Sequence, residues 1–275
     1  MNYRHAFHAG NFADLVKHAA LLRLLAELTA SGGPLTVIDT HAGRGLYDLG
    51  GEEAKRSGEA EAGVLKLRRA RDAPPELAPL RKAVADLNGG GPMRRYPGSP
   101  WLIAESLRPG DRYIACELRA EEHEALGAVL KGRGEAVRTL NADGYAAAVA
   151  ECPPRGRVLV LIDPPFERPD DYEQAARALG AILRNNPGAT VAIWLPLKDL
   201  ETFDGFLRRL RSGGAEKVLV AEARLRPLHD PMKMNGCAMV VVNPPVALRD
   251  RAQAVCEEVV RTLGDPGGLA KVWKL

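Results

Sequence analysis

The chain has 275 residues, 46% of them hydrophobic, which suits one large globular domain or one domain carrying an insertion. A formal net charge of +3, from 38 Lys and Arg against 35 Asp and Glu, excludes a histone-like arm or an acidic tail but allows a local basic face. No apolar run of membrane-spanning length and no secretion signal is found, and the four cysteines form no CxxC pair. We therefore expect a cytoplasmic protein with no membrane contact and no bound metal.

The first predicted elements are a helix and a strand, and a long insertion follows them. Apolar residues at helical spacing predict a helix over 12–30, and LTVID predicts a strand over 35–39. About 70 residues separate this strand from the next, far more than one crossover helix needs. We therefore predict a small helical subdomain at 50–98, inserted into a domain made of residues 1–49 and 99–275.

From residue 101 onward, predicted helices alternate with predicted strands. The helices are expected at 101–107, 120–131, 145–150, 170–184, 200–210 and 247–263, and the strands at 112–117, 135–140, 158–162, 190–195, 217–226 and 237–243. This alternation predicts an α/β fold with a mostly parallel sheet covered on both faces. The last two strands have no helix between them, so we expect them to pair antiparallel at one edge.

Within the predicted insertion, residues 66–95 carry a net charge of +5, which exceeds the +3 of the whole chain. Between Lys66 and Arg95 there are eight basic residues against three acidic ones. A phosphate-binding patch that contacts RNA is one interpretation, and a solvated helical face is the other. Charge alone does not separate the two.

A glycine-containing turn, Asp39-Thr-His-Ala-Gly-Arg-Gly45, follows the first predicted strand. It lacks the Gly-Lys-Ser/Thr of a P-loop and the third glycine of a dinucleotide fingerprint. The spacing D-x-x-x-G-x-G is typical of S-adenosylmethionine-dependent methyltransferases, where glycines such as Gly43 and Gly45 let the backbone approach the cofactor. An ordinary turn between a strand and a helix would explain the same spacing.

Two more acidic residues follow the next strands. Glu117 ends RYIACE, where a carboxylate can accept hydrogen bonds from both hydroxyls of a cofactor ribose. Asp143, between Ala142 and Gly144, can accept from an adenine amino group while a neighbouring backbone N–H faces the ring. The simpler interpretations are a solvated residue at a helix start for Glu117 and a helix N-cap for Asp143.

The motif with the most specific chemistry is Asp163-Pro-Pro-Phe166, directly after the apolar strand VLVLI. The prolines lack N–H donors, so the turn presents the Asp163 carboxylate and the Pro164 carbonyl as acceptors for an NH₂ group. Phe166 can stack on a planar base. This motif is typical of methyltransferases that act on the amino group of adenine, cytosine or glutamine. The similar Asn243-Pro-Pro-Val246 lacks the aromatic, and we interpret it as structural, on an edge strand.

Aromatic, basic and imidazole groups crowd the N-terminus, in YRHAFHAGN with Asp14, Lys17 and His18 after it. This mixture suits contact with nucleic acid. A metal site is the competing interpretation, but no carboxylate or cysteine has ligand spacing with the histidines. A flexible tail is the simplest interpretation, although a tail does not normally hold so many aromatic and histidine side chains.

In chain order, the segments YRHAFHAGNFADLVKH, DTHAGRGLY, YPGSP, ACEL, DGY and IDPPFE resemble the bacterial ribosomal RNA large-subunit methyltransferase J family (RlmJ). The resemblance covers essentially the whole chain. It implies a Rossmann-like seven-stranded class I methyltransferase sheet with a small inserted helical subdomain, and methylation of adenine N6 in 23S ribosomal RNA. It further implies S-adenosylmethionine contacts at His18, His41, Ser99, Glu117, Asp143 and Asp163, and substrate contacts at Tyr3, His5 and Lys17.

Four functions remain open at this point. Transfer of a methyl group from S-adenosylmethionine to N6 of an unstacked adenine in 23S ribosomal RNA is favoured, and the same reaction on DNA is the alternative, because both substrates present the same base edge. Methylation of a protein glutamine is disfavoured by the basic insertion. A non-catalytic RNA-binding module leaves the motifs at Asp39 and Asp163 unexplained. We expect a monomer, since the sequence suggests no extended apolar interface.

Overall fold

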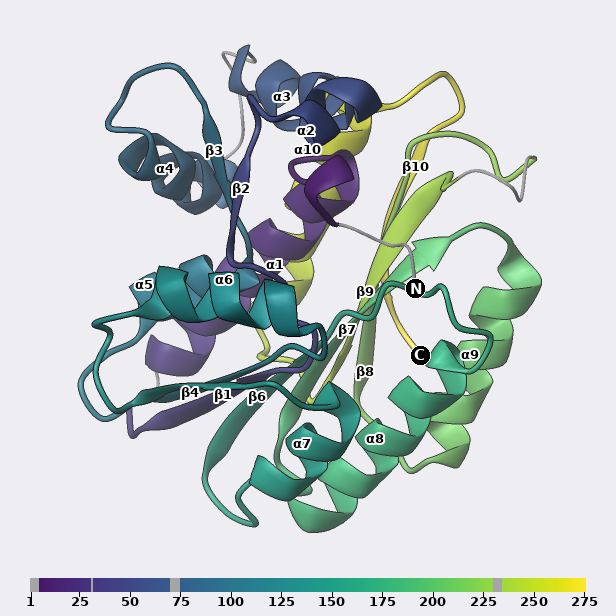
Figure 1. The fold of residues 1–275 in the computed structure, drawn as a ribbon. Helices are drawn as coiled ribbons and strands as arrows, with labels where there is room; N and C mark the ends of the chain where they lie inside the picture. The colour runs from purple at the N-terminus through teal and green to yellow at the C-terminus, as the bar shows by residue number, and fades with distance from the viewer. Residues whose placement is uncertain (1–4, 31, 70–74, 230–233) are drawn as a thin grey trace.

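The computed structural model describes residues 5–30, 32–69, 75–229 and 234–275, which form one twisted sheet with helices on both faces (Figure 1). The sheet has eight strands in the order β10-β8-β9-β7-β6-β1-β4-β5. Five of them run parallel: β1 (Leu35–Asp39), β4 (Arg112–Cys116), β5 (Val137–Leu140), β6 (Arg157–Ile162) and β7 (Thr190–Leu197). The predicted α/β class with a mostly parallel core is therefore confirmed.

The remaining strands make the other end of the sheet antiparallel. β9 (Gly236–Val242) pairs antiparallel with both β7 and β8 (Val218–Arg224), and β10 (Leu269–Lys274) pairs antiparallel with β8 at the edge. The expected count of seven strands is thus wrong by one. β10 was missed because its segment, LAKVWK, is short and largely solvent-accessible, so no continuous apolar run marks it.

The position of β9 also corrects the interpretation of Asn243-Pro-Pro-Val246, because this strand lies inside the sheet and not at its edge. β9 runs antiparallel to β7, so its end lies at the opposite side of the sheet from the end of β6, where Asp163 follows. Asn243 Nδ2 donates hydrogen bonds to the carbonyls of Pro187 and Ala189, both at 2.9 Å. This turn therefore anchors the start of β7.

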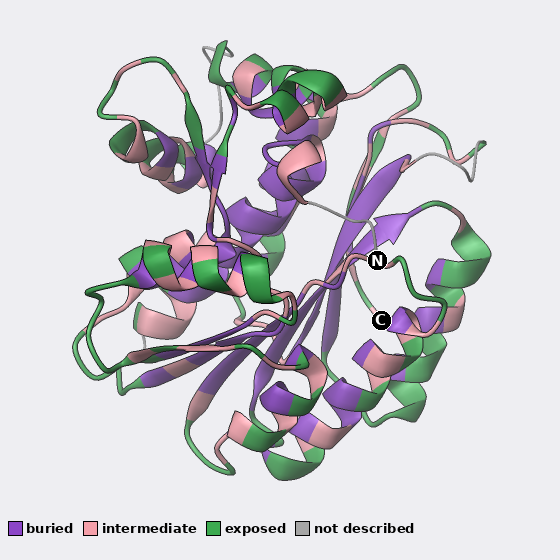
Figure 2. Ribbon diagram, viewed as in Figure 1, coloured by how far each residue is buried: buried purple, intermediate pink, exposed green. Residues whose placement is uncertain are grey.

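Alternate residues along each strand point to opposite faces, and each face has its own hydrophobic core. In β6, Leu159 and Leu161 belong to one core and Val158, Val160 and Ile162 to the other. The first core is covered by α1 (Phe12–Ala30), α5 (Ser99–Ser106), α6 (Ala120–Leu130) and α10 (Leu248–Leu263). The second is covered by α7 (Gly144–Glu151), α8 (Asp171–Asn185) and α9 (Leu200–Ser212). The central strands β6, β7 and β9 are almost wholly buried between the layers (Figure 2).

Residues 50–98 lie beside this sheet, next to a short ribbon. β2 (Leu46–Asp48) and β3 (Arg95–Pro97) pair antiparallel at either end of the segment. Between them lie α2 (Glu52–Ser57), the wide helical turn η2 (Glu61–Leu65), α3 (Lys66–Arg69), the 3₁₀ turn η3 (Pro75–Leu77) and α4 (Ala78–Leu87) (Figure 1). Val64, Leu67 and Leu80 from this segment join the core that contains Leu15 of α1. The segment therefore packs against α1 and shares its core.

The basic side chains of this segment remain accessible to solvent. Of the eight, Arg71 lies outside the described residues and Arg81 is half-buried, and the other six are exposed: Lys66, Arg68, Arg69, Lys82, Arg94 and Arg95. Among the helices of the described residues, none is long and apolar enough to cross a membrane.

Candidate active site

A cavity of about 370 Å³ opens at the carboxyl ends of β1, β4, β6 and β7. In an open parallel sheet this edge is where ligands bind, at the point where the strand order reverses. Most of the predicted site residues line the cavity: His5, Lys17, His18, His41, Gly43, Ser99, Glu117, Asp143, Gly144, Asp163, Pro164 and Phe166. Asp39, Gly45 and Ala142 do not line it, and Tyr3 lies outside the described residues.

The Asp163-Pro-Pro-Phe166 turn forms one wall of the cavity, directly after β6. Phe166 has φ +50°, a conformation that few residues other than glycine adopt. Its ring packs against Tyr172, with the ring centroids 4.6 Å apart, and against Trp194 at 6.0 Å. These aromatic neighbours hold the strained turn, so Asp163 and Pro164 are presented to the cavity by a fixed backbone.

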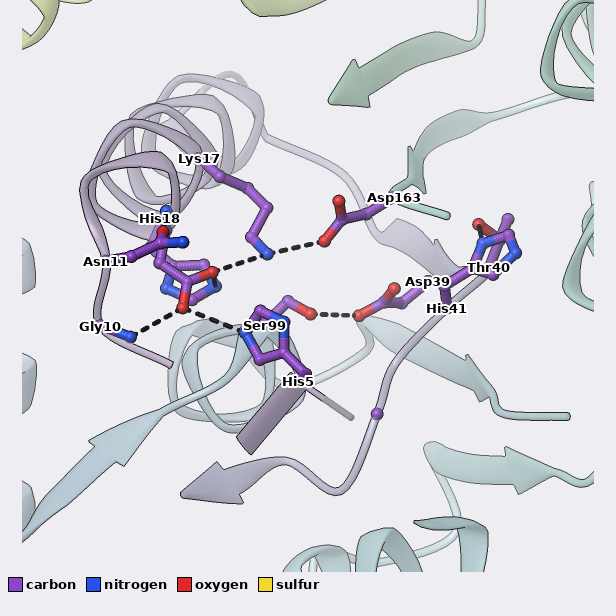
Figure 3. Close-up of polar contacts among 12 residues, drawn as sticks. His5, Gly10, Asn11, Lys17, His18, Asp39, Thr40, His41, Ser99 and Asp163 are labelled. Atoms are coloured by element: carbon purple, nitrogen blue, oxygen red, sulfur yellow. Dashed lines mark hydrogen bonds and ion pairs between the residues drawn. The ribbon is translucent and has the colours of Figure 1, made fainter. Parts of the chain in front are cut away.

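Lys17 is shared by two carboxylates, one of which is Asp163, and Figure 3 shows its bond to Asp163. The Lys17 ammonium donates to Asp163 Oδ2 at 2.6 Å and pairs with Asp14 Oδ1 at 2.9 Å. Burial lowers the pKa of Lys17, but the charges of Asp14 and Asp163 outweigh it and hold that pKa well above its usual range. α1 is thereby joined to the Asp163 turn, 146 residues further along the chain.

Hydrogen bonds to the N-terminus of α1 fix the segment that precedes this helix. Asn11 caps α1 by accepting from Asp14 N–H at 2.9 Å, and Asp14 Oδ2 accepts from Gly10 N–H at 2.9 Å and from His5 Nε2 at 3.0 Å. The Glu59 carboxylate, at the start of the inserted segment, accepts from the Asn11 side chain at 2.9 Å and bonds His8 Nδ1 at the same distance. The N-terminal turn is therefore ordered, not a flexible tail, from His5 onward.

Asp39 lies behind the cavity wall and has no exposed surface. Its Oδ2 accepts from Ser99 Oγ at 2.7 Å and from the Tyr113 hydroxyl at 3.3 Å, while its buried Oδ1 has no hydrogen-bond partner among the described residues. Burial raises the pKa of Asp39 to about 7, although the Ser99 hydrogen bond opposes this rise. Burial of a carboxylate with one oxygen unsatisfied disfavours its charged form, in agreement with the raised pKa.

This pKa gives a testable pH dependence of stability. Below about pH 4 Asp39 is protonated in both folded and unfolded chains, and between about pH 4 and 7 only the folded chain keeps the proton. As the pH rises over this interval, we expect the free energy of unfolding of the wild type to fall relative to that of Asp39→Asn. The fall should be about 1.4 kcal/mol for each unit by which the Asp39 pKa differs between folded and unfolded chains, and it should end above pH 7. Urea unfolding of both proteins from pH 4 to 8 measures this, and a constant difference in unfolding free energy would contradict it.

Two of the histidines in the cavity lining, His18 and His41, are neutral. Burial lowers the pKa of His18 to about 3 and that of His41 to about 4. His18 Nδ1 shares a 2.9 Å hydrogen bond with the Tyr96 hydroxyl, and the His41 ring meets the edge of Tyr145 with centroids 4.8 Å apart. Both histidines therefore act through hydrogen bonds and packing, not through positive charge.

Acidic groups line the far side of the cavity. Glu117 accepts from the backbone N–H of Gly43 at 2.9 Å and of Arg119 at 2.8 Å, so its carboxylate is held at the mouth of the glycine turn. Asp143 Oδ1 accepts from Tyr145 and Ala146 N–H, which confirms its interpretation as the N-cap of α7. The cavity is thus rich in acceptors, and no group of three or more potential metal ligands occurs among the described residues.

Gly43, Gly45 and Gly144 were predicted to contact the cofactor, and the structure shows that each also has a conformational or packing role. Gly43 and Gly45 have φ +63° and +83°, values that other residues rarely adopt, so they allow the chain to turn after β1. Gly144 is required by close packing, because a Cβ atom there would lie 1.8 Å from the Thr40 carbonyl oxygen.

Two contributing residues were not among the predicted site residues. Tyr96 is fully buried and bonds His18, and Asp14 joins the N-terminal turn to Lys17. The second had a readable signal: Asn11-x-x-Asp14 before an apolar helix is close to a capping box, which predicts reciprocal hydrogen bonds at the helix start. Tyr96 had none, since its partner is 78 residues away in the sequence.

Comparisons with known proteins find relatives that match nearly the whole chain. The model of the family described as "Ribosomal RNA large subunit methyltransferase D, RlmJ" matches residues 32–275. Proteins named Ribosomal RNA large subunit methyltransferase J are 34% identical in Haemophilus influenzae, covering 97% of this chain and 95% of the relative, and 33% identical in Escherichia coli, covering 93% and 91%. A crystal structure of a Legionella pneumophila protein superposes with a TM-score of 0.89 at 29% identity, covering 97% of this chain and 98% of the other.

Proposed function

Because the chain belongs to the ribosomal RNA large-subunit methyltransferase J family, we propose that it transfers a methyl group from S-adenosylmethionine to N6 of an unstacked adenine in 23S ribosomal RNA. The main structural support for methylation of an amino group is the Asp163-Pro-Pro-Phe166 turn in the wall of the cavity. Its acceptors match an exocyclic NH₂ group, and its backbone contributes no competing donors at the prolines.

The acceptor-rich cavity fits S-adenosylmethionine, which carries an ammonium group, ribose hydroxyls and an adenine amino group. Glu117 would accept from the ribose hydroxyls, and Asp143 with the adjoining backbone at Ala142 and Gly144 would contact the adenine. The wall formed by Ser99, with the orphaned Asp39 Oδ1 behind it, would face the ammonium group. His18, His41 and Gly43 would line the same pocket, and Gly45 would support the turn next to it.

When bound, S-adenosylmethionine supplies a methyl group on a positively charged sulfur. The chain's own residues act on the target amine. A base must leave its stack to enter such a pocket, and Phe166 would then stack on it. The amine would donate one N–H to Asp163 Oδ1 and the other to the Pro164 carbonyl. These acceptors draw the nitrogen lone pair out of conjugation and stabilise the positive charge that develops there. Asp163 takes the proton once the methyl group has been transferred.

We assign the two remaining predicted surfaces to the RNA. Tyr3, His5 and Lys17 would lie on the substrate side of the pocket, and the basic residues of 50–98 would contact phosphates outside it. The N-terminal turn and the inserted segment are bonded together through Glu59, so the two surfaces are held next to each other.

The phosphate contacts predict a change in salt dependence. Replacing Lys66, Arg94 and Arg95 with Ala should weaken binding to ribosomal RNA and reduce the slope of log K against log salt by about 2, since each phosphate contact contributes about 0.7–0.9. The rate at saturating RNA should not change. The matched control removes three exposed basic residues from the end of α9, Arg208, Arg209 and Arg211. An equal loss of slope in both variants would contradict a phosphate-binding role for the insertion.

Labelled methyl transfer to unmodified ribosomal RNA, genomic DNA and ribosomal proteins tests the proposed reaction. We expect incorporation into ribosomal RNA. Incorporation into DNA alone would support the alternative substrate, incorporation into protein would point to glutamine, and binding to RNA without any incorporation would leave a non-catalytic module.

A further inference from the structure

Asp14 has more hydrogen-bond partners than a helix start needs. It is 2% exposed, and its two oxygens serve different groups: Oδ2 accepts from His5 and from Gly10 N–H, and Oδ1 pairs with Lys17. The Lys17 ammonium contacts this carboxylate at 2.9 Å and that of Asp163 at 2.6 Å. Since the capping contacts use only Oδ2, the contact between Oδ1 and Lys17 requires a separate explanation.

We propose that Asp14 is a positioning residue for methyl transfer: it is the counter-ion that prevents the Lys17 ammonium from neutralising Asp163. This inference rests on the proposed function, in which Asp163 accepts a hydrogen bond from the target amine. Lys17 bonds Asp163 through Oδ2, and in the proposed reaction Oδ1 accepts from the target amine.

The charges of the three groups support this role. Lys17 has 7% of its side chain exposed and Asp163 14%, so solvent screens them weakly. Burial raises the pKa of Asp14, but His5 and Lys17 outweigh that effect and hold it well below its usual range, so Asp14 remains ionised. With Asp14 present, the Lys17 ammonium has two carboxylate partners, and Asp14 also bonds His5. Without it, Lys17 and Asp163 form a neutral pair.

A neutral pair would be a weaker site for two reasons. The ammonium would have one counter-ion only, and it would compete with the target amine for the Asp163 carboxylate. The positive charge that develops on the amine nitrogen would also meet an adjacent ammonium that is no longer balanced by Asp14. Two imidazole rings lie near Asp14. That of His5 is hydrogen-bonded to Asp14 Oδ2, and that of His18 adds no positive charge because burial keeps it neutral.

A double-mutant cycle on the full chain tests the proposal, with Asp14→Asn, Lys17→Met and the double variant. Asn keeps an oxygen that can accept from Gly10 N–H, so the helix start is preserved. Asp14→Asn should lower kcat about a hundredfold at saturating RNA and cofactor, in the range measured when one buried electrostatic partner of a transition state is removed. Lys17→Met will itself slow the reaction, but the double variant should be no slower than Lys17→Met alone, because the unbalanced ammonium is then absent.

A purely structural role predicts a different result. In that case Asp14→Asn would slow Lys17→Met by the same factor by which it slows the wild type, and this additivity would overturn the proposal. Glu258→Gln is the matched control: Glu258 is 6% exposed and paired with Arg261 on α10, and its loss should lower stability without changing kcat.

A second measurement does not depend on activity. NMR titration of ¹³C-labelled lysine should show the Lys17 pKa falling in Asp14→Asn, and an unchanged pKa would exclude the counter-ion role. The cycle is run on the nucleic acid that the wild type methylates. A wild type active on DNA only would therefore contradict the proposed substrate while still testing Asp14, and an inactive wild type would contradict the proposed function while the titration still tests the counter-ion role.

Discussion

Replacing Asp163 with Ala should lower methyl transfer at least about a thousandfold while leaving RNA affinity within a few-fold of the wild type. The carboxylate accepts a hydrogen bond from the reacting nitrogen and is not needed for RNA binding elsewhere, so its loss should lower kcat. The fold should survive, because Lys17 keeps Asp14 as its partner. Single-turnover rates and RNA binding, measured separately, check both halves of the prediction.

Asp163→Asn sharpens the test. It keeps the size of the side chain but can place an NH₂ group against the target amine, so we expect nearly the same loss of rate. Melting temperatures close to that of the wild type would show that neither variant is simply unfolded. Turnover near the wild-type rate in either variant would remove Asp163 from the reaction.

Gly144→Ala should have the largest effect on stability of any conservative change in the pocket. Its Cβ would lie 1.8 Å from the Thr40 carbonyl oxygen and 2.5 Å from the Thr40 carbonyl carbon. Both contacts are with backbone, so the end of β1 and the start of α7 would have to separate. We expect a loss of about 3 kcal/mol or more in the free energy of unfolding, measured with urea.

Gly127→Ala is the control for this substitution. Gly127 lies inside α6, and an added Cβ atom there would have no heavy atom within 4 Å. Alanine in a helix interior is favoured over glycine by about 0.5–1 kcal/mol, so this variant should be slightly more stable than the wild type. Equal effects at the two positions would mean that the close approach of β1 and α7 is not what requires Gly144.

The sequence predicted the core strands well, because buried parallel strands are continuous apolar runs. VLVLI and TVAIWL correspond to β6 and β7, and the acidic or glycine-containing segments after β1, β4 and β6 meet at one sheet edge, as parallel strands require. β10 has no such run, and its place at the edge depends on pairing with β8, which no local pattern specifies. The interior position of β9 was missed for the same reason.

The positions of the site residues could be predicted from the sequence, but their hydrogen-bond partners could not. The Asp-Pro-Pro-Phe motif placed Asp163 in the site, and the family resemblance implied Lys17 and Ser99. The structure adds that Lys17 bonds Asp163 and that Ser99 bonds Asp39. Such partners lie 60 to 146 residues apart, and only tertiary packing brings them together. Burial also sets the protonation of Asp39 and His18, which cannot be inferred from residue type alone.

Nucleoside mass spectrometry of unmodified 23S ribosomal RNA, incubated with the protein and S-adenosylmethionine, tests the central claim most directly. The proposed reaction predicts N6-methyladenosine, mapped to a defined adenine and absent when Asp163→Ala replaces the wild type. Methylation of a base other than adenine, or of DNA or protein while the ribosomal RNA stays unmodified, would contradict it.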